Sequence, residues 1–201
     1  MDYLISTEKC CIPHILKIQQ NNGIIVYLDD IFDYYMKNSL EINKLMNISN
    51  KIALCFKNKK KPSKKNKTRI IFTPHGNKLI KEEEYYNLIK IIKPFYYEDF
   101  NNFIIKNENE SFNYFTPKNL EELIELVKEN KIIDTLFINE LTNQGKMIHD
   151  GKIGEIKKCD CCDFKEEYLK YLFEIKEINS FILIQKHNFN ELNKIIKQLN
   201  K

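Results

Sequence analysis

Three cysteines and one histidine near the end of the sequence have side chains that bind metal ions. Cys159, Cys161 and Cys162 lie within four residues, and His187 follows after an amphipathic stretch. Thiolate and imidazole ligands suit a structural zinc ion. The alternative is free buried thiols and a surface histidine, because two adjacent cysteines reach one ion only where the backbone bends. We expect Zn²⁺ held by Cys159, Cys161, Cys162 and His187.

Length and composition set the class of protein. With 201 residues, of which 43% are hydrophobic and 30% charged, the chain can bury the core of one domain or of two small ones. The sequence has no run of about 18 apolar residues and no basic-then-apolar leader, so we expect a cytoplasmic protein without membrane insertion. In that reducing compartment, clustered cysteines are more often metal ligands than disulfides.

A basic run occupies residues 57–69, with the sequence KNKKKPSKKNKTR and no acidic residue. Pro62 and Ser63 interrupt any helix, so we expect a mobile loop. One interpretation is contact with the phosphate backbone of RNA, which adds salt-dependent affinity without sequence choice. The other is a solvated low-complexity insertion. The candidate RNA-binding residues are Lys59, Lys60, Lys61, Lys64, Lys65, Lys67 and Arg69.

Apolar periodicity predicts a mixed α/β fold. Short apolar runs predict strands at residues 24–28, 52–56, 69–73, 112–115 and 132–138. Helical spacing predicts helices at 31–37, at 81–93 before Pro94, and from Thr116 as the cap with Leu120, Leu123, Ile124 and Val127 buried. A strand, helix, strand order is typical of α/β units with parallel strands.

After the cysteines, three elements are expected. Tyr168, Leu172 and Ile175 form an apolar stripe on one helix, and residues 181–184 form a strand. Asn188 then caps a last helix, with Glu191 completing a variant of the capping box. His187 would stand at the start of that helix, where a zinc ion would connect the two helices.

The C-terminal segments also carry a family resemblance. CDCC at 159–162, EYLKYLFEIKE at 167–177 and KHNFNELNKIIKQL at 186–199 resemble the zinc-binding end of tRNA-guanine transglycosylases, which show a C-x-C-x-x-C cluster, a Y-L-x-x-L-x-x-x-E helix and a final helix opened by His-Asn. Residues 117–145 look like the family's penultimate barrel segment. Residues 4–14 and 81–94 are similar to parts of the accessory subunit of the eukaryotic queuine enzyme.

The resemblance implies a (β/α)8 barrel with a zinc subdomain. Because such barrels need about 200 to 250 residues, we expect a shortened, degenerate TIM-barrel-like α/β domain that lacks the middle of the barrel, between Phe100 and Phe112. The expected parts are a strand-rich N-terminal part at 1–68 with the basic loop, a partial barrel-like α/β segment at 69–150, and a helical zinc-binding subdomain at 151–201.

The residues expected at the reaction centre differ from the family pattern. The aspartate nucleophile normally follows the phenylalanine of V-D-x-F, but here Phe137 is followed by Ile138, which cannot attack a ribose carbon. The third cysteine is also shifted, because two residues are lost between Cys161 and Cys162. No catalytic residue is therefore assigned.

Three functions follow from the resemblance. The first is a non-catalytic accessory subunit of a queuine tRNA-ribosyltransferase, whose partners are a catalytic tRNA-guanine transglycosylase subunit and tRNA. The second is a zinc-stabilised RNA- or ribosome-binding module derived from that family. The third is an active transglycosylase, in which Asp134 or Glu140 would have to act as the nucleophile.

Overall fold

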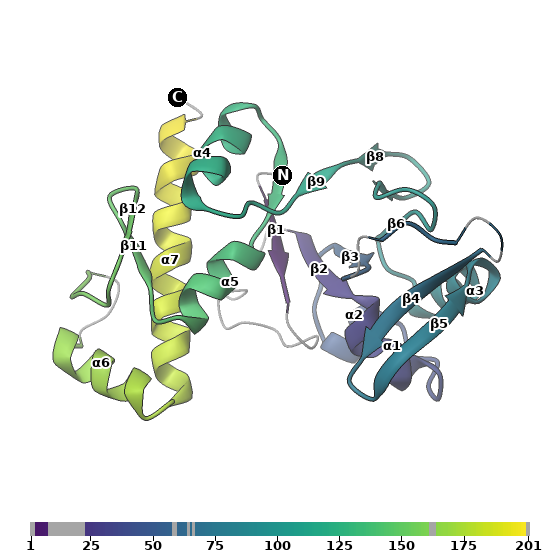
Figure 1. The fold of residues 1–201 in the computed structure, drawn as a ribbon, viewed down its shortest axis with the longest axis horizontal. Coiled ribbons are helices and arrows are strands. Elements are labelled where there is room, and N and C mark those ends of the chain that lie inside the picture. Colours follow the sequence, from purple (N-terminus) through teal and green to yellow (C-terminus); the bar gives the residue numbers. More distant parts are fainter. Residues whose placement is uncertain are drawn as a thin grey trace. The chain divides into compact units, whose positions relative to one another are not determined.

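The protein is a mixed α/β chain, as the sequence predicts. The computed structural model describes residues 3–7, 23–57, 60–63, 65, 67–160 and 164–199 (Figure 1). They divide into two compact units, an N-terminal unit up to Tyr114 and a C-terminal unit from Phe115. The boundary therefore falls inside the segment 69–150 that the sequence analysis treats as one part. No helix among the described residues has the length and apolar character needed to span a membrane.

A mainly parallel sheet forms the core of the N-terminal unit. Within this unit its strands lie in the order β8-β7-β6-β3-β2-β1. Strands β1, β2, β3 and β6 are parallel, and β7 is antiparallel to both β6 and β8 at one edge. Every residue of the first three strands is buried, which explains their nearly continuous apolar runs. The strands are β1 (Tyr3–Ser6), β2 (Gly23–Tyr27), β3 (Ile52–Cys55), β6 (Tyr96–Glu98), β7 (Ile105–Lys106) and β8 (Ser111–Phe112).

Helices and a hairpin complete this unit. The helices are α1 (Leu28–Tyr35), α2 (Ile42–Met46) and α3 (Glu82–Ile92), and the hairpin pairs β4 (Thr68–Thr73) with β5 (Gly76–Lys81). The helix predicted at 81–93 is confirmed: the Glu84 carboxylate accepts a hydrogen bond from the Lys81 N–H at its start. It ends at Ile92, and Lys93 adopts a left-handed conformation before Pro94.

The C-terminal unit is mainly helical. The long helix α7 contacts α4, α5, α6 and β11, and Figure 1 shows it in yellow. The elements are β9 (Tyr114–Phe115), which begins at the boundary, α4 (Leu120–Lys128), β10 (Ile132–Asp134), α5 (Leu136–Asn143), the hairpin strands β11 (Met147–His149) and β12 (Lys152–Gly154), α6 (Glu166–Glu174) and α7 (Ile178–Leu199).

Two predicted elements at the C-terminal end are wrong. The strand expected at 181–184 and the helix expected from Asn188 are one helix of 22 residues, α7. Its buried residues Ser180, Ile184, His187 and Glu191 recur every three or four positions, so the short apolar run belongs to a helical pattern. His187 therefore lies inside a helix rather than at its start, and Asn188 does not cap one.

Three smaller predictions also need correction. Asn119, not Thr116, caps α4, because its side chain accepts a hydrogen bond from the Glu122 N–H at 2.8 Å. The strand expected at 132–138 ends at Asp134, and α5 follows. In α6 the buried residues are Leu169 and Leu172, whereas Tyr168 and Ile175 are exposed.

Candidate metal centre

Asn188 connects helix α7 to strand β11. Its side-chain oxygen accepts a hydrogen bond from the Ile148 N–H at 2.9 Å, and its side-chain nitrogen donates one to the Lys146 carbonyl at 2.9 Å. The residue is fully buried. These bonds satisfy backbone groups of the strand that would otherwise be buried without a partner. The hairpin is therefore held in a fixed position on α7.

His187, one residue before Asn188, is 5% exposed and contacts the same strand. Its Nε2 lies 2.7 Å from the carbonyl oxygen of Ile148. A carbonyl only accepts hydrogen bonds, so this nitrogen carries the proton, and in the neutral ring the lone pair is on Nδ1. Burial lowers the pKa of His187, which favours the neutral ring. A backbone carbonyl that holds one ring nitrogen is a common arrangement around histidines that bind metals through the other.

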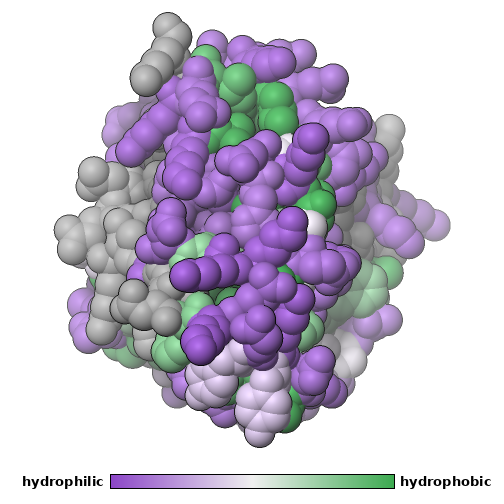
Figure 2. Space-filling model, turned by 90° about the vertical axis from the view of Figure 1, so that its left-hand side faces the viewer, coloured by the Kyte–Doolittle hydropathy of each residue, from purple (hydrophilic) through white to green (hydrophobic). Residues whose placement is uncertain are grey.

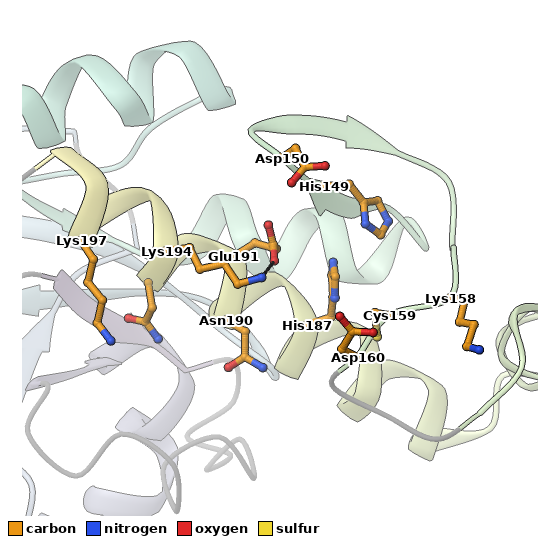
Figure 3. Close-up of a pocket in the computed structure, with 11 residues that line it drawn as sticks. His149, Asp150, Lys158, Cys159, Asp160, His187, Asn190, Glu191, Lys194 and Lys197 are labelled. Atoms are coloured by element: carbon orange, nitrogen blue, oxygen red, sulfur yellow. Dashed lines mark hydrogen bonds and ion pairs between the residues drawn. The ribbon is translucent and has the colours of Figure 1, made fainter.

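A second imidazole lies beside it. The ring centroids of His149, at the end of β11, and His187 are 4.7 Å apart, with the planes inclined at 47°. The Nε2 atom of His149 is buried, and no hydrogen-bond partner for it exists among the described residues. Figure 3 shows both rings in the space between the hairpin and α7.

Both histidines line a cavity of about 550 Å³ in the C-terminal unit. The segment after β12 contributes Cys159 and two charged residues to its wall, and α7 contributes polar and charged side chains (Figure 3). Glu191 in this wall forms an ion pair with Lys194 at 2.6 Å. The lining residues are His149, Asp150, Lys158, Cys159, Asp160, His187, Asn190, Glu191, Asn193, Lys194 and Lys197.

Of the four predicted zinc ligands, two are described, and both line this cavity. They are Cys159 and His187, which lie 28 positions apart in the sequence. Cys161 and Cys162 lie outside the described residues. In the described part of the chain, no three His, Cys, Asp or Glu side chains are arranged to hold a metal ion. The donor types nevertheless fit zinc, since one thiol and two imidazoles line the same cavity.

His149 is not among the site residues predicted from the sequence. The signal for it is weak, because the residue lies at the end of a short apolar run and 38 positions before His187. The two rings come together only because Asn188 and His187 of α7 contact the backbone of β11. The scarcity of histidine, with four in the chain, was the one feature that could have identified it.

The basic run has two structurally different parts. Lys60, Lys61 and Lys65 are exposed, and so is Lys67, whose ammonium lies 3.6 Å from the Glu82 carboxylate. The backbone folds back at this point, because the Ser63 N–H donates to the Thr68 carbonyl at 2.9 Å. Of the other candidates, Lys59 and Lys64 lie outside the described residues.

The prediction that Arg69 is an exposed RNA-binding residue of the basic run is wrong. It belongs to β4 rather than to the loop, and it is 3% exposed. Its guanidinium lies 3.9 Å from the centre of the Phe56 ring and 3.6 Å from the Glu98 carboxylate, and it donates a hydrogen bond to the Phe100 carbonyl. A side chain enclosed in this way cannot contact an RNA backbone, so we remove Arg69 from the candidate RNA-binding residues.

The residues near the position expected for a nucleophile have structural roles. Ile138 is fully buried in α5. The Asp134 carboxylate is also buried, accepting hydrogen bonds from the Thr116 hydroxyl at 2.6 Å and the Leu136 N–H at 3.1 Å. These contacts hold the start of α5.

No family model matches the chain, and no curated protein matches it.

Proposed function

We propose that this chain is a shortened, degenerate barrel-like relative of tRNA-guanine transglycosylases that acts as a non-catalytic accessory subunit. It would support queuosine modification of tRNA by dimerising with a catalytic subunit. The observation that carries the proposal is the double role of the His-Asn pair. His187 lines a cavity with Cys159, and Asn188 fixes the hairpin beside it, so both members of the pair have a role in this unit, within α7 rather than at a helix start.

The proposed cofactor is one zinc ion with a structural role. Cys159 and His187 would hold it together with Cys161 and Cys162. The ion would connect the segment after β12 to α7, and its binding free energy would add to the stability of the C-terminal unit. Its function would be to stabilise the unit, and no reaction step is assigned to it.

A cluster of exposed apolar residues around α6 supports a protein partner. Phe164, Tyr168, Tyr171, Ile175 and Ile178 recur at intervals of four and three residues and are 43% to 67% exposed. The Phe164 and Tyr168 rings lie 5.6 Å apart, and the Tyr168 and Tyr171 rings 6.4 Å apart. Figure 2 shows that most of the face it displays is hydrophilic, with smaller apolar patches. Of these residues, Tyr168 and Tyr171 lie in α6 itself, while Ile175 and Ile178 lie at its end and at the start of α7. An exposed apolar cluster of this kind is typical of surfaces that dock on a partner.

The exposed lysines of the basic run support contact with tRNA. Lys60, Lys61 and Lys65 are exposed, and each phosphate that a lysine neutralises adds salt-dependent affinity. The contact would be to the backbone, because the one arginine of the chain is buried. Base selection would therefore belong to the catalytic subunit.

Co-purification tests the dimer. Tagged protein should recover a full-length catalytic transglycosylase together with tRNA. The double variant Tyr168→Glu/Tyr171→Glu should reduce that recovery at least about tenfold, because two buried aromatic anchors commonly carry this much binding energy. Tyr34→Glu, at an exposed tyrosine of α1, is the matched control and should leave recovery unchanged. Recovery of no transglycosylase would contradict the proposal.

The second candidate is a zinc-stabilised RNA- or ribosome-binding module. The exposed lysines favour it equally, since they require no protein partner. Sequencing of the co-purified RNA separates the two candidates: ribosomal or unrelated RNA without a transglycosylase would select the second. An active transglycosylase is disfavoured, because the Asp134 carboxylate holds the start of α5 and Ile138 stands where the family has its nucleophile.

A further inference from the structure

The outward face of the β4–β5 hairpin is apolar. Ile70, Phe72 and Leu79 are 44%, 46% and 66% exposed. They share one face because side chains alternate along a strand, and Ile70 lies directly opposite Leu79 in the pairing register. Exposed apolar residues gathered on one face mark interaction sites more often than single ones do. This patch belongs to the N-terminal unit and has no part in the function proposed above.

Strand β5 is also an open sheet edge. The hairpin is a two-stranded sheet (Figure 1), and the described part of the chain places no strand on the other side of β5. The Phe72 N–H points away from β5, because it donates to the Asp29 carboxylate at 2.8 Å. Hydrogen-bonded and non-hydrogen-bonded pairs alternate along an antiparallel ladder. Asn77, which faces Phe72, and Leu79, two residues on, therefore direct their N–H and C=O groups to the open side of β5.

The surroundings of this edge are basic. Residues 57–81 contain nine lysines, one arginine and no acidic residue. Lys81 is exposed on the outward face, and Lys67 is exposed one position before β4. Two of the three glutamates that follow β5 are engaged, Glu82 by the Lys67 ammonium and Glu84 by the Lys81 N–H. The charge of the region therefore favours an acidic ligand.

Lysines on an edge strand often block its pairing with another chain. Lys78 does not serve that purpose here, because its ammonium pairs with the Asp33 carboxylate of α1, on the face opposite to the apolar patch. Leu79, the next residue, is the most exposed of the three apolar side chains. The middle of β5 is therefore open to a further strand.

We infer that β5 binds an extended, acidic segment of a partner protein, which adds to the hairpin as a third strand. In this mode of recognition, main-chain hydrogen bonds supply affinity, here to Asn77 and Leu79, and side chains supply specificity. Apolar side chains of the segment pack beside Leu79 on the outward face, and its carboxylates lie near Lys67 and Lys81. The inference goes beyond the proposed function, because it requires neither zinc nor a transglycosylase.

Two other occupants fit this surface less well. A second copy of the chain would pair β5 with itself and bring together two strands that carry lysines and no acid. RNA bases bind sheet faces by stacking on aromatic rings, and only Phe72 of the three apolar residues is aromatic. RNA also has no peptide backbone to continue the ladder at the edge of β5.

Titration of the full chain with fluorescently labelled peptides of six residues, the length of β5, tests the inference. A peptide of three Glu-Val repeats should bind, and one of three Lys-Val repeats should not. The Glu-Val peptide with every backbone nitrogen methylated should also fail to bind, because it cannot donate to the edge. With the Glu-Val peptide bound, the Asn77 and Leu79 amides should exchange their hydrogens more slowly.

A surface variant locates the binding site. Leu79→Glu should weaken binding of the Glu-Val peptide at least about tenfold, because it removes an apolar contact and adds a like charge. Leu40→Glu, at another exposed leucine of the N-terminal unit, is the matched control and should leave the affinity unchanged. The comparison of peptides on the wild-type chain decides the matter even where Leu79→Glu does not fold.

Several outcomes would overturn the inference. They are no binding of the Glu-Val peptide at about 1 mM, equal binding of the methylated peptide, and unchanged exchange of the Leu79 amide. Binding of a uridine oligonucleotide that Leu79→Glu weakens, without binding of the Glu-Val peptide, would assign the face to RNA instead. A wild-type dimer that Leu79→Glu dissociates would assign β5 to a second copy of the chain.

Discussion

The two units use buried polar side chains in different ways. In the N-terminal unit, Asp29 accepts hydrogen bonds from the Lys57 and Phe72 N–H groups at 3.0 and 2.8 Å, and Arg69 is enclosed with Glu98. In the C-terminal unit, Asn188 holds the β11 hairpin on α7, and the His149 and His187 rings lie side by side in the wall of a cavity. The buried polar groups named for the first unit are enclosed in its core, whereas those of the second stand at the edge of a space that a ligand can enter.

The largest effect should come from breaking the Arg69 and Glu98 pair. Glu98→Ala leaves the guanidinium buried without its carboxylate, so we expect the free energy of unfolding to fall by about 3 to 5 kcal/mol. Urea unfolding, with and without zinc, measures this free energy. Lys67→Ala, which breaks the exposed ion pair with Glu82, should cost less than about 1 kcal/mol. A similar cost for the two variants would mean that Arg69 is not the core residue described above.

A slightly smaller loss should follow Asn188→Ala. The Ile148 N–H and the Lys146 carbonyl would lose their partner, and each unsatisfied buried group costs about 1–3 kcal/mol. We expect a total of about 2 to 4 kcal/mol, together with faster hydrogen exchange of the Ile148 amide. Asn190→Ala, two positions along the same helix and in the same cavity wall, is the control. If exchange at Ile148 is unchanged, Asn188 does not clamp the hairpin.

The sequence predicts the helices and strands that have strong local patterns. The buried strands at 24–28 and 52–56 follow from uninterrupted apolar runs, and the helix at 81–93 follows from its spacing and from Pro94. The run at 181–184 misleads because four apolar residues fit a strand and a buried helix equally well. Only its continuation through His187 shows that it is helical.

Arg69 could not be predicted, because its surroundings come from distant parts of the chain. The strand alternates, so that Arg69, Ile71 and Thr73 point inward while Ile70 and Phe72 are 44% and 46% exposed. Local sequence favours the opposite register, with isoleucine and phenylalanine inside. The buried carboxylate of a residue 29 positions later reverses that preference. The position of His149 beside His187 could not be predicted either, because the two residues are distant in the sequence.

Removal of the proposed zinc ion should lower the stability of the C-terminal unit. At a free concentration 100 times the dissociation constant, one bound ion contributes about 2.7 kcal/mol, so a chelator should lower the melting temperature of the wild-type chain. Cys159→Ser should abolish this response. Cys55→Ala replaces a cysteine of the N-terminal sheet, buried in β3, and should lower stability while keeping the response to the chelator. Equal responses in both variants would argue against a site at Cys159.

The smallest expected effect tests whether a structural contact of the C-terminal unit is independent of the candidate metal centre. Asn119→Ala removes the cap of α4, and we expect a cost of about 1 kcal/mol, measured by urea unfolding, with Lys118→Ala as the exposed neighbouring control. Because the cap is not among the cavity-lining residues, zinc affinity should stay unchanged, unlike in Cys159→Ser. If Asn119→Ala weakened zinc binding as much as Cys159→Ser, general loosening of the unit would explain both results. The contrast between structural polar contacts and the residues of the cavity would then lose its meaning.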